Sequence, residues 1–347
     1  MKSLKQMGGG LTSWENIKNA WMEFALDKTK KPDVIAFKKN LKHHLNFIQK
    51  ELQNKTYSHG SYETFYVKDP KLRKINKACV RDRVVHRALF RKLYPVFDKI
   101  FIYDSYSCRI GKGTHRAVRR LHEFFQKESN NNTKNCFVLK CDVKKFFENI
   151  DRDMLLGFIS RRVKDKHALW LAEVIIKSFL SGLPLGNITS QLFANVYLNE
   201  LDHFIKQTLR VTYYIRYCDD FVILSEDKKY LEGLIPKIDD FLRTRLKMSL
   251  HPNKVTISKY RQGVDFLGYV SFPYFTVVRV KTKKRMFKRV KSRLIDFRSG
   301  LIKKESLEAT LLSYLGMLKH CNAFLVKQEL LELIASFGLP GIDKLCK

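Results

Sequence analysis

The chain has 347 residues, of which 45% are hydrophobic, so it can bury a substantial core and its composition excludes an intrinsically disordered chain. It carries 66 lysines and arginines against 34 aspartates and glutamates, and the formal net charge of +32 repels itself in a compact state unless a polyanion neutralises it. Charge alone would also fit a basic ribosomal or chromatin-like protein. A polyanion, above all a nucleic acid, is the partner that this charge favours.

The cysteines and the N-terminal sequence indicate where the protein resides. The 7 cysteines are odd in number and scattered, without the close pairs of a zinc site, so we expect reduced thiols. The first residues lack the continuous apolar core of a signal peptide, and no apolar run approaches the roughly 18 residues that a membrane span requires. We therefore expect a soluble cytoplasmic protein without a membrane partner.

Hydrophobic periodicity predicts a helical start to the chain. Apolar residues recur at helical spacing between Ser13 and Leu52, with a break near Lys31 and Pro32, so we expect two helices. The further elements predicted up to residue 135 are, in chain order, a strand over 62–67, a basic loop over 68–77, a helix over 82–94, an irregular stretch over 104–113, a helix from Thr114 and a polar loop over 129–135.

The middle of the chain alternates strands and helices. A strand over 136–142 ends in a carboxylate, and Asp151 is placed to cap the helix over 151–158. The following elements are a helix over 168–180, a turn over 182–186, a long amphipathic helix over 189–206, strands over 211–216 and 221–224, a helix over 231–246, strands over 255–258 and 265–270, and basic helices beyond residue 281. This order predicts a mixed α/β fold of the α+β type, with a split βαββαβ sheet rather than a helix bundle.

Two adjacent carboxylates, Asp219 and Asp220, lie where the strands over 211–216 and 221–224 are joined. Neighbouring side chains of a strand point to opposite faces, so one of them can bind a cation while the other supports it. Asp142, at the end of a separate strand, supplies a third carboxylate. Oxygen ligands without histidine or cysteine favour Mg²⁺, and the pattern fits two-metal displacement at phosphorus. An isolated Asp-Asp pair is more often a solvated turn, and the third carboxylate is what favours a metal site.

Six segments of the chain, in the same order, resemble the motifs of reverse transcriptases. Tyr217-Cys-Asp-Asp220 resembles the YxDD box, and the segment 139–151 resembles the preceding motif of bacterial members. The other matching segments are 80–86 (VRDRVVH), 105–115 (SYSCRIGKGTH), 182–191 (GLPLGNITSQ) and 264–269 (VDFLGY). One such segment would be weak evidence, whereas six in family order make the resemblance specific.

The resemblance implies a right-hand polymerase that copies RNA into DNA. It implies an N-terminal helical extension over 1–60, fingers over 61–140, a ferredoxin-like palm over 141–280 and a short helical thumb over 281–347. The implied catalytic carboxylates are Asp142, Asp219 and Asp220, and the implied ligands of two Mg²⁺ ions, which Mn²⁺ can replace, are Asp142, Val143, Asp219 and Asp220. The implied partners are template RNA, the cDNA–RNA duplex and deoxynucleoside triphosphates (dNTPs).

The same resemblance implies further site residues. Phe147 stands where the family keeps a ring beneath the incoming sugar, and such a ring would collide with a ribose 2′-hydroxyl, although at least one of Phe146 and Phe147 is expected in the core. Arg83 and Arg109 are expected to hold the triphosphate or the template, or else to be helix arginines paired with glutamate. The implied nucleotide-binding residues are Lys77, Arg83, Arg109, Phe147, Leu185 and Gly186, and the implied nucleic-acid-binding residues are Lys74, Gly113, Asn187, Ser190, Gln191 and Tyr217.

The segment around Leu185 indicates which subfamily of reverse transcriptases the chain resembles. Group II intron enzymes and many viral ones have Gln before the glycine and end the box in Ser-Pro, whereas this chain has Leu185-Gly186-Asn187 and Ser190-Gln191. This form resembles the enzymes of diversity-generating retroelements, which copy template RNA with errors at adenines and work with a small basic accessory protein, expected as an oligomer. Leucine can pack against a nucleotide but cannot hydrogen-bond it, so low fidelity is expected. Because the given sequence ends with the short thumb, we also expect no maturase or endonuclease domain of the kind found in full-length intron proteins.

Two alternatives remain open. A retron or antiviral-defence reverse transcriptase would share the palm and its carboxylates but would differ in template and priming. A basic RNA-binding protein with an inactive palm belongs to another class, and three intact aspartates argue against it.

Overall fold

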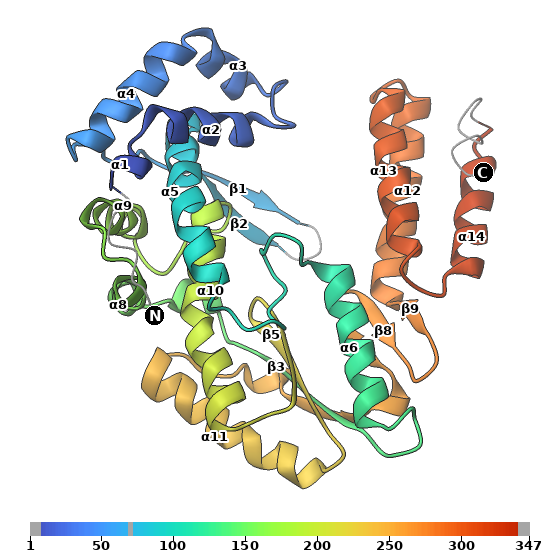
Figure 1. Cartoon of the computed structure of the whole chain (residues 1–347). Helices are drawn as coiled ribbons and strands as arrows, with labels where there is room; N and C mark the ends of the chain where they lie inside the picture. The colour runs from blue at the N-terminus through green and yellow to red at the C-terminus, as the bar shows by residue number, and fades with distance from the viewer. Residues whose placement is uncertain (1–7, 69–71, 339–347) are drawn as a thin grey trace. The chain divides into compact units, whose positions relative to one another are not determined.

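The computed structural model describes residues 8–68 and 72–338, and the predicted mixture of helices and strands is confirmed (Figure 1). These residues form two compact units, between which the chain passes several times. The first unit contains the described parts of 1–112, with 140–222 and 232–255, and the second contains 113–139, 223–231 and the described part of 256–347. The predicted limits of fingers, palm and thumb stay predictions.

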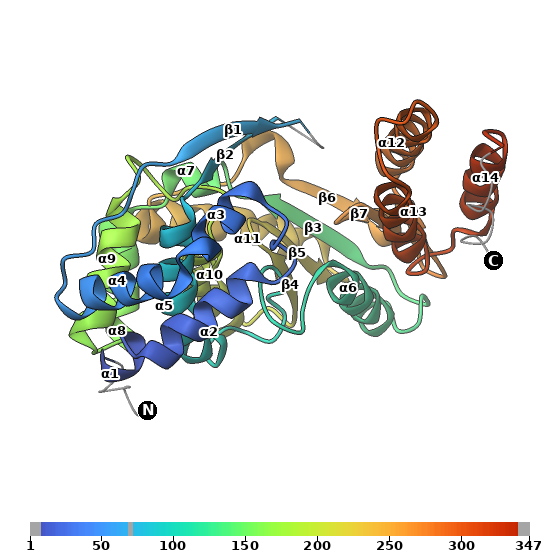
Figure 2. The same ribbon diagram turned by 90° about the horizontal axis from the view of Figure 1, so that it is seen from above.

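The core of the first unit is built around α5 (Val80–Asp98) and α10 (Ile188–His203), which pack against each other, with α2 (Trp14–Ala25) on α5 (Figures 1 and 2). The predicted helix over 82–94 is confirmed and extends through Pro95. The prediction that the helix from residue 189 is amphipathic was wrong. Twelve of the 16 side chains of α10 are buried, as in a helix that packs on most sides. The helix passes into a single π-helical turn, Phe204–Thr208.

The second of the two helices predicted before Leu52 is in fact two helices. α3 (Pro32–Lys39) begins with a proline in its first turn, and α4 (Leu41–Gln53) follows after Asn40 alone. Asn40 has φ −118° and ψ 39°, outside the helical region. The apolar spacing continues across this break, which is why the periodicity predicted one helix.

The predicted strand over 62–67 is confirmed as β1 (Glu63–Val67), but the predicted basic loop was wrong in its second half. Residues Arg73–Lys77 form β2, which pairs antiparallel with β1 from Glu63 opposite Lys77 to Val67 opposite Arg73. Residues 69–71 of that predicted loop lie outside the described residues. The basic side chains of β2 are therefore held on a hairpin.

A four-stranded sheet has the order β4-β5-β3-β6. Its strands are β3 (Phe137–Asp142), β4 (Tyr213–Tyr217), β5 (Asp220–Ser225) and β6 (Thr256–Lys259). Helices separate β3 from β4, a two-residue turn joins β4 to β5, and α11 (Lys228–Leu246) separates β5 from β6. This is the strand order of a split βαββαβ sheet, so the predicted fold class is confirmed.

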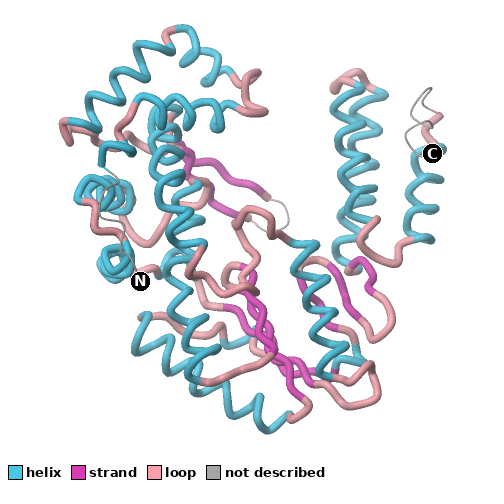
Figure 3. The backbone as a smooth tube through the Cα atoms, in the orientation of Figure 1, coloured by secondary structure: helices cyan, strands magenta, loops and turns pink. Residues whose placement is uncertain are grey.

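The second unit contains a small sheet of order β7-β8-β9 and four of the longer helices (Figure 3). Its elements are α6 (Thr114–Glu128), β7 (Val264–Phe266), β8 (Tyr269–Ser271), β9 (Thr276–Val278), α12 (Val280–Arg298), α13 (Lys304–Leu318) and α14 (Phe324–Ala335). The single strand predicted over 265–270 was wrong, because Leu267 and Gly268 have φ of 54° and 89° and turn the chain into a hairpin.

Four further helices and two 3₁₀ turns complete the elements of the described residues. They are α1 (Gly8–Leu11), α7 (Phe146–Asn149), α8 (Arg152–Arg162), α9 (Lys166–Lys177) and the 3₁₀ turns Pro252–Lys254 and Tyr260–Gln262. Asp151 caps α8 as predicted, since its side chain accepts a hydrogen bond from the Met154 N–H at 2.9 Å. No helix in the described part of the chain has the length and apolar character to cross a membrane.

Candidate active site

Three carboxylates come from two neighbouring strands within the first unit. Asp142 ends β3, Asp219 lies in the turn between β4 and β5, and Asp220 begins β5. The N–H of Val143 donates to the carbonyl of Asp219 at 3.3 Å, so the end of one strand is tied to the turn. The fold thus brings together the residues proposed from the sequence as metal ligands.

Burial and mutual repulsion both oppose ionisation of these carboxylates. Burial is the largest cause that raises the pKa of Asp219, and the charge of Asp142 adds to it. Burial, together with Asp219 and Asp142, raises the pKa of Asp220 to about 6 although Lys140 acts in the opposite direction. Such a cluster carries more negative charge than its cations compensate, and a bound cation would relieve that excess.

Lys254 is a neighbour of these carboxylates that sequence reasoning missed. Its Nζ donates to Asp142 Oδ2 at 2.8 Å, and the backbone N–H of His251 donates to the Asp142 carbonyl at 2.8 Å. The segment before it is fixed by the bond from the Lys144 N–H to the Ser249 carbonyl at 3.0 Å. More than 100 residues separate Lys254 from Asp142, and no local pattern links them.

The carboxylate oxygens of Asp142, Asp219 and Asp220 are the ligand type that hard cations prefer. In the residues that the structure describes, no group of three His, Cys, Asp or Glu side chains is placed to hold a metal ion by itself. Mg²⁺ is commonly bound by one or two carboxylates, with water and substrate phosphates completing its shell. Carboxylates without histidine or cysteine partners therefore fit Mg²⁺ and do not fit a closed structural zinc site.

Phe147 lies in α7, shortly after the end of β3. Its neighbour Phe146 is buried, with 2% of its surface exposed, whereas Phe147 is half-buried. The Leu183 N–H donates to the Phe147 carbonyl at 2.8 Å, and a Cβ on Gly182 would collide with that oxygen. Only glycine permits this approach, so the turn at Gly182 fixes the backbone of Phe147.

The segment from Leu185 to Gln191 runs beside β2. The Asn76 N–H donates to the Leu185 carbonyl at 2.9 Å, and a Cβ added to Gly186, which has φ 120°, would lie 3.1 Å from Ile75 Cγ2. Leu185 is half-buried. Asn187, the residue before α10, is buried. In the first turn of α10, Ser190 is buried and Gln191 is exposed. Tyr217, at the end of β4, is half-buried.

Lys77 and Arg83 share a carboxylate on α3. Lys77 Nζ lies 3.0 Å from Asp33 Oδ2, and Arg83 Nη2 lies 2.5 Å from the same oxygen. Lys77 also pairs with Glu63 at 3.3 Å. A triphosphate bound by these two cations would have to compete with Asp33. Lys74, on the same strand as Lys77, is exposed.

Arg109 is largely buried and bound to its own loop. Its Nε donates to Asp98 Oδ1 at 2.7 Å, and its Nη1 donates to the carbonyls of Ile102 and Ser105 at 2.7 and 3.0 Å. The alternative that Arg109 is an exposed helix arginine paired with glutamate was wrong, because Arg109 lies in a loop and pairs with Asp98. Binding of the triphosphate or the template by Arg109 stays a prediction. Gly113, with φ 119°, precedes α6 in the second unit.

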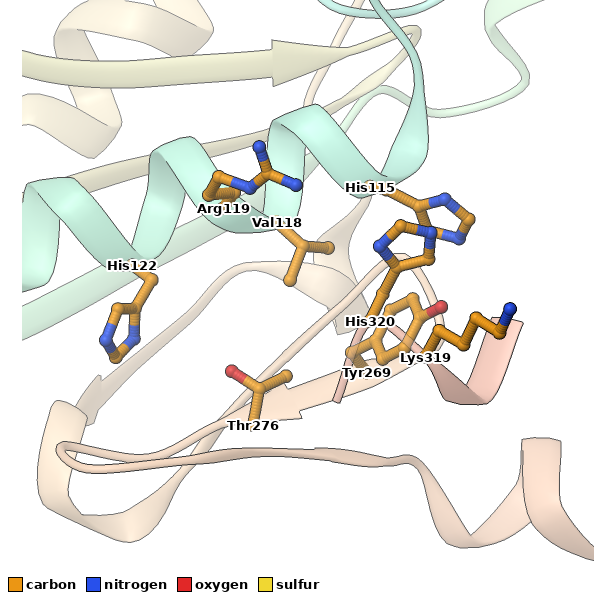
Figure 4. A pocket seen from close by; sticks show the side chains of 8 residues that line it. All are labelled: His115, Val118, Arg119, His122, Tyr269, Thr276, Lys319 and His320. Atoms are coloured by element: carbon orange, nitrogen blue, oxygen red, sulfur yellow. The ribbon is translucent and has the colours of Figure 1, made fainter. Parts of the chain in front are cut away.

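A separate pocket of about 280 Å³ lies within the second unit (Figure 4). Arg119, Lys319 and three histidines contribute to its lining, and the rings of His115 and His320 stack at 3.7 Å. Burial, followed by the charge of His320, lowers the pKa of His115. Its basic lining, with Arg119 and Lys319, suits an anion.

Comparisons with known proteins agree with this geometry. Residues 67–271 match the family model described as reverse transcriptase (RNA-dependent DNA polymerase).

The chain is 24% identical to Protein YkfC of Escherichia coli (strain K12) over 241 residues, which are 57% of this chain and 63% of that protein. It is 23% identical to the group II intron-encoded protein LtrA of Lactococcus lactis subsp. cremoris over 297 residues, covering 64% of this chain and 48% of LtrA. It is 27% identical to nuclear intron maturase 3, mitochondrial, of Arabidopsis thaliana over 228 residues, covering 54% of this chain and 30% of the maturase. The chain thus spans between about a third and two thirds of these relatives.

Proposed function

The chain belongs to the reverse transcriptase family, and from this premise we propose that it copies template RNA into DNA by nucleotidyl transfer at Asp142, Asp219 and Asp220. The observation that carries the proposal is the meeting of the β3 end with the β4–β5 turn, tied by the bond from Val143 to Asp219. Primer extension on an RNA template with dNTPs tests it.

We propose two Mg²⁺ ions as cofactors, held by the three carboxylates and the Val143 carbonyl, with Mn²⁺ as a substitute. When bound, such ions activate the attacking hydroxyl and stabilise the leaving pyrophosphate. The protein's own part is to hold the carboxylates at adjacent ends of the two central strands, β3 and β5. Lys254 compensates the charge of Asp142, with its Nζ 2.8 Å from Oδ2, and keeps this carboxylate oriented.

Phe147 is proposed to select deoxyribonucleotides, and Phe147→Val should weaken that selection. The smaller side chain would remove the collision with a ribose 2′-hydroxyl, so the ratio of kcat/KM for dNTP to that for the matching ribonucleotide should fall by about 10-fold or more. Single-nucleotide extension with each substrate measures the ratio.

Phe146→Val is the matched control for Phe147→Val, because it removes the same volume from the adjacent buried ring. It should lower the melting temperature and leave the sugar selectivity unchanged. If Phe147→Val keeps the wild-type ratio, the ring that selects the sugar is not Phe147.

We further propose that the enzyme belongs to a diversity-generating retroelement and makes errors at template adenines with a small basic accessory protein. Leu185-Gly186-Asn187 and Ser190-Gln191 support this assignment. The half-buried Leu185 lies beside β2, where its apolar side chain can pack against a nucleotide without offering it a hydrogen bond. A pair of near-identical genomic repeats that differ at adenines would be expected beside its gene.

Leu185→Gln should lower the error rate opposite adenine. A hydrogen-bonding group would stabilise correctly placed nucleotides more than misplaced ones, because only the former keep the group in register. Sequencing of cDNA made by wild type and variant on one adenine-rich template, at equal dNTP concentrations, measures substitutions at each template base.

The control for Leu185→Gln is Leu185→Met, which keeps an apolar side chain of similar volume and should keep the wild-type error pattern. Few and evenly distributed wild-type errors would contradict the retroelement assignment. Adenine errors that Leu185→Gln leaves unchanged would contradict only the role of Leu185.

A further inference from the structure

Arg216 is the largest fully buried side chain in the described part of the chain, with 0% of its surface exposed. It lies in β4, two residues before the turn that carries the carboxylates. A buried guanidinium is costly unless it is paired and its donors are satisfied. Asp202 of α10, also 0% exposed, supplies the opposite charge.

All five N–H donors of this guanidinium have acceptors. Nε and Nη2 donate to the two carboxylate oxygens of Asp202 at 2.7 and 2.6 Å. The other acceptors are Ser105 Oγ at 3.1 Å from Nη2, and Asn195 Oδ1 at 3.2 Å and the Cys218 carbonyl at 3.0 Å, both from Nη1. Such full satisfaction fixes the orientation of a side chain.

The backbone of Arg216 is fixed as well. Its N–H donates to the Asp104 carbonyl at 3.0 Å, and its carbonyl accepts from the Tyr106 N–H at 2.9 Å. Asp202, which pairs with the guanidinium, also accepts a hydrogen bond from the Tyr214 hydroxyl at 2.7 Å. The Cys218 carbonyl is therefore bound to a rigid donor rather than to a mobile side chain.

The backbone conformation of Cys218 requires a stabilising contact such as this hydrogen bond from Arg216. Cys218 is the first of the two residues in the β4–β5 turn, and its φ is 58°. Turns of this length with a positive φ favour glycine or asparagine, and a cysteine there persists only when its surroundings hold it. The next residues are Asp219 in the turn and Asp220 at the start of β5, so the conformation of Cys218 affects where both carboxylates point.

We propose that Arg216 is a positioning residue that fixes the carboxylates of Asp219 and Asp220 through its hydrogen bond to the Cys218 carbonyl. The proposal rests on the proposed role of those carboxylates. Asp202 and Asn195 orient the guanidinium, and the charge pair itself never touches the substrate. The role predicts a defect in the chemical step rather than in RNA binding.

The test uses the full chain in single-nucleotide primer extension on RNA, with kcat, KM for dNTP, RNA affinity and melting temperature measured for each variant. Arg216→Lys keeps a cation for Asp202 but cannot reproduce the five-donor fork. It should lower kcat by about 10²-fold, the size of loss expected from a small misplacement of reacting groups, with unchanged RNA affinity. The MgCl₂ concentration for half-maximal rate should rise, because the carboxylates no longer converge.

Tyr214→Phe is the matched control. It removes a hydrogen bond to the same buried Asp202 and leaves the contact between Arg216 and Cys218 in place. It should keep the wild-type kcat and the wild-type MgCl₂ requirement. A kcat for Arg216→Lys equal to that of Tyr214→Phe would overturn the proposal.

If Arg216→Lys does not fold, Asn195→Ala takes its place, because Asn195 shares the Nη1 group with Cys218. It should raise the MgCl₂ requirement and lower kcat, and wild-type values for both would overturn the proposal. Asp219→Ala separates the two hypotheses. If it keeps a near-normal rate, the proposed carboxylate site is wrong, whereas loss in Asp219→Ala with none in the Arg216 and Asn195 variants rejects only the positioning role.

Discussion

Replacing Asp142 or Asp219 with asparagine is expected to lower the rate of primer extension by about 10³-fold or more, because each change removes an anionic ligand that contributes several kcal/mol of charge stabilisation. Asparagine has nearly the same volume as aspartate, so folding and RNA binding should persist. The melting temperature of Asp219→Asn should not fall, since burial and repulsion from Asp142 raise the pKa of Asp219 and oppose its charged form. That of Asp142→Asn should fall slightly, because Lys254 loses its partner carboxylate. Single-turnover extension with Mg²⁺, thermal unfolding and RNA binding provide the three measurements.

Asp153→Asn is the control for the change of charge. Asp153 lies in the exposed first turn of α8, and its replacement alters the net charge by the same amount. Extension by this variant should remain at the wild-type rate. A near-normal rate for the Asp142 or Asp219 variant would remove that residue from the proposed site.

RNA affinity is expected to fall steeply with salt. The net charge of +32 includes the exposed lysines 284, 288 and 291, which recur on one face of α12 while Met286, Val290 and Leu294 are buried on the other. Six or more phosphate contacts would release enough counterions to weaken binding by about 10³-fold between about 50 and 200 mM salt. Fluorescence titration of a labelled RNA at several KCl concentrations measures the slope.

A triple variant with Gln at lysines 284, 288 and 291 should reduce the slope of log Kd against log salt by about 2 to 3. Its melting temperature should be unchanged because these side chains are exposed. A flat salt dependence in the wild type would mean that the positive charge serves a partner other than nucleic acid.

Local patterns predicted the elements that carry the carboxylates. The strand before Asp142 and the hairpin around Asp219 are short apolar runs with polar ends, and their limits differ by only a few residues from the observed strands. The failures occur where backbone conformation overrides side-chain type. Asn40 interrupts one periodic helix, and Leu267 adopts a positive φ in what reads as a continuous strand.

The rest of the site depends on contacts between distant parts of the chain. Lys254 contacts Asp142, and Asp33 contacts Arg83, only because the fold brings distant parts of the chain together. Neither Lys254 nor Asp33 lies in a recognisable motif. Arg216 stands beside the hairpin motif, but its complete burial could not be read from a charged residue in a strand. Strand β2 was missed because its sequence is mostly basic and lacks the apolar alternation typical of a strand. Pairing with β1 is what stabilises it as a strand.

The most direct test of the central claim is binding of Mn²⁺, measured by the loss of the free-ion electron paramagnetic resonance signal in the presence of primer, RNA template and dNTP. Wild-type protein should bind Mn²⁺, and excess Mg²⁺ should displace it. Protein carrying both Asp142→Asn and Asp219→Asn should bind the same RNA but leave the Mn²⁺ signal at the level of the nucleic acid and nucleotide alone. Equal binding of Mn²⁺ by wild type and double variant would contradict the assignment of these carboxylates as the metal site.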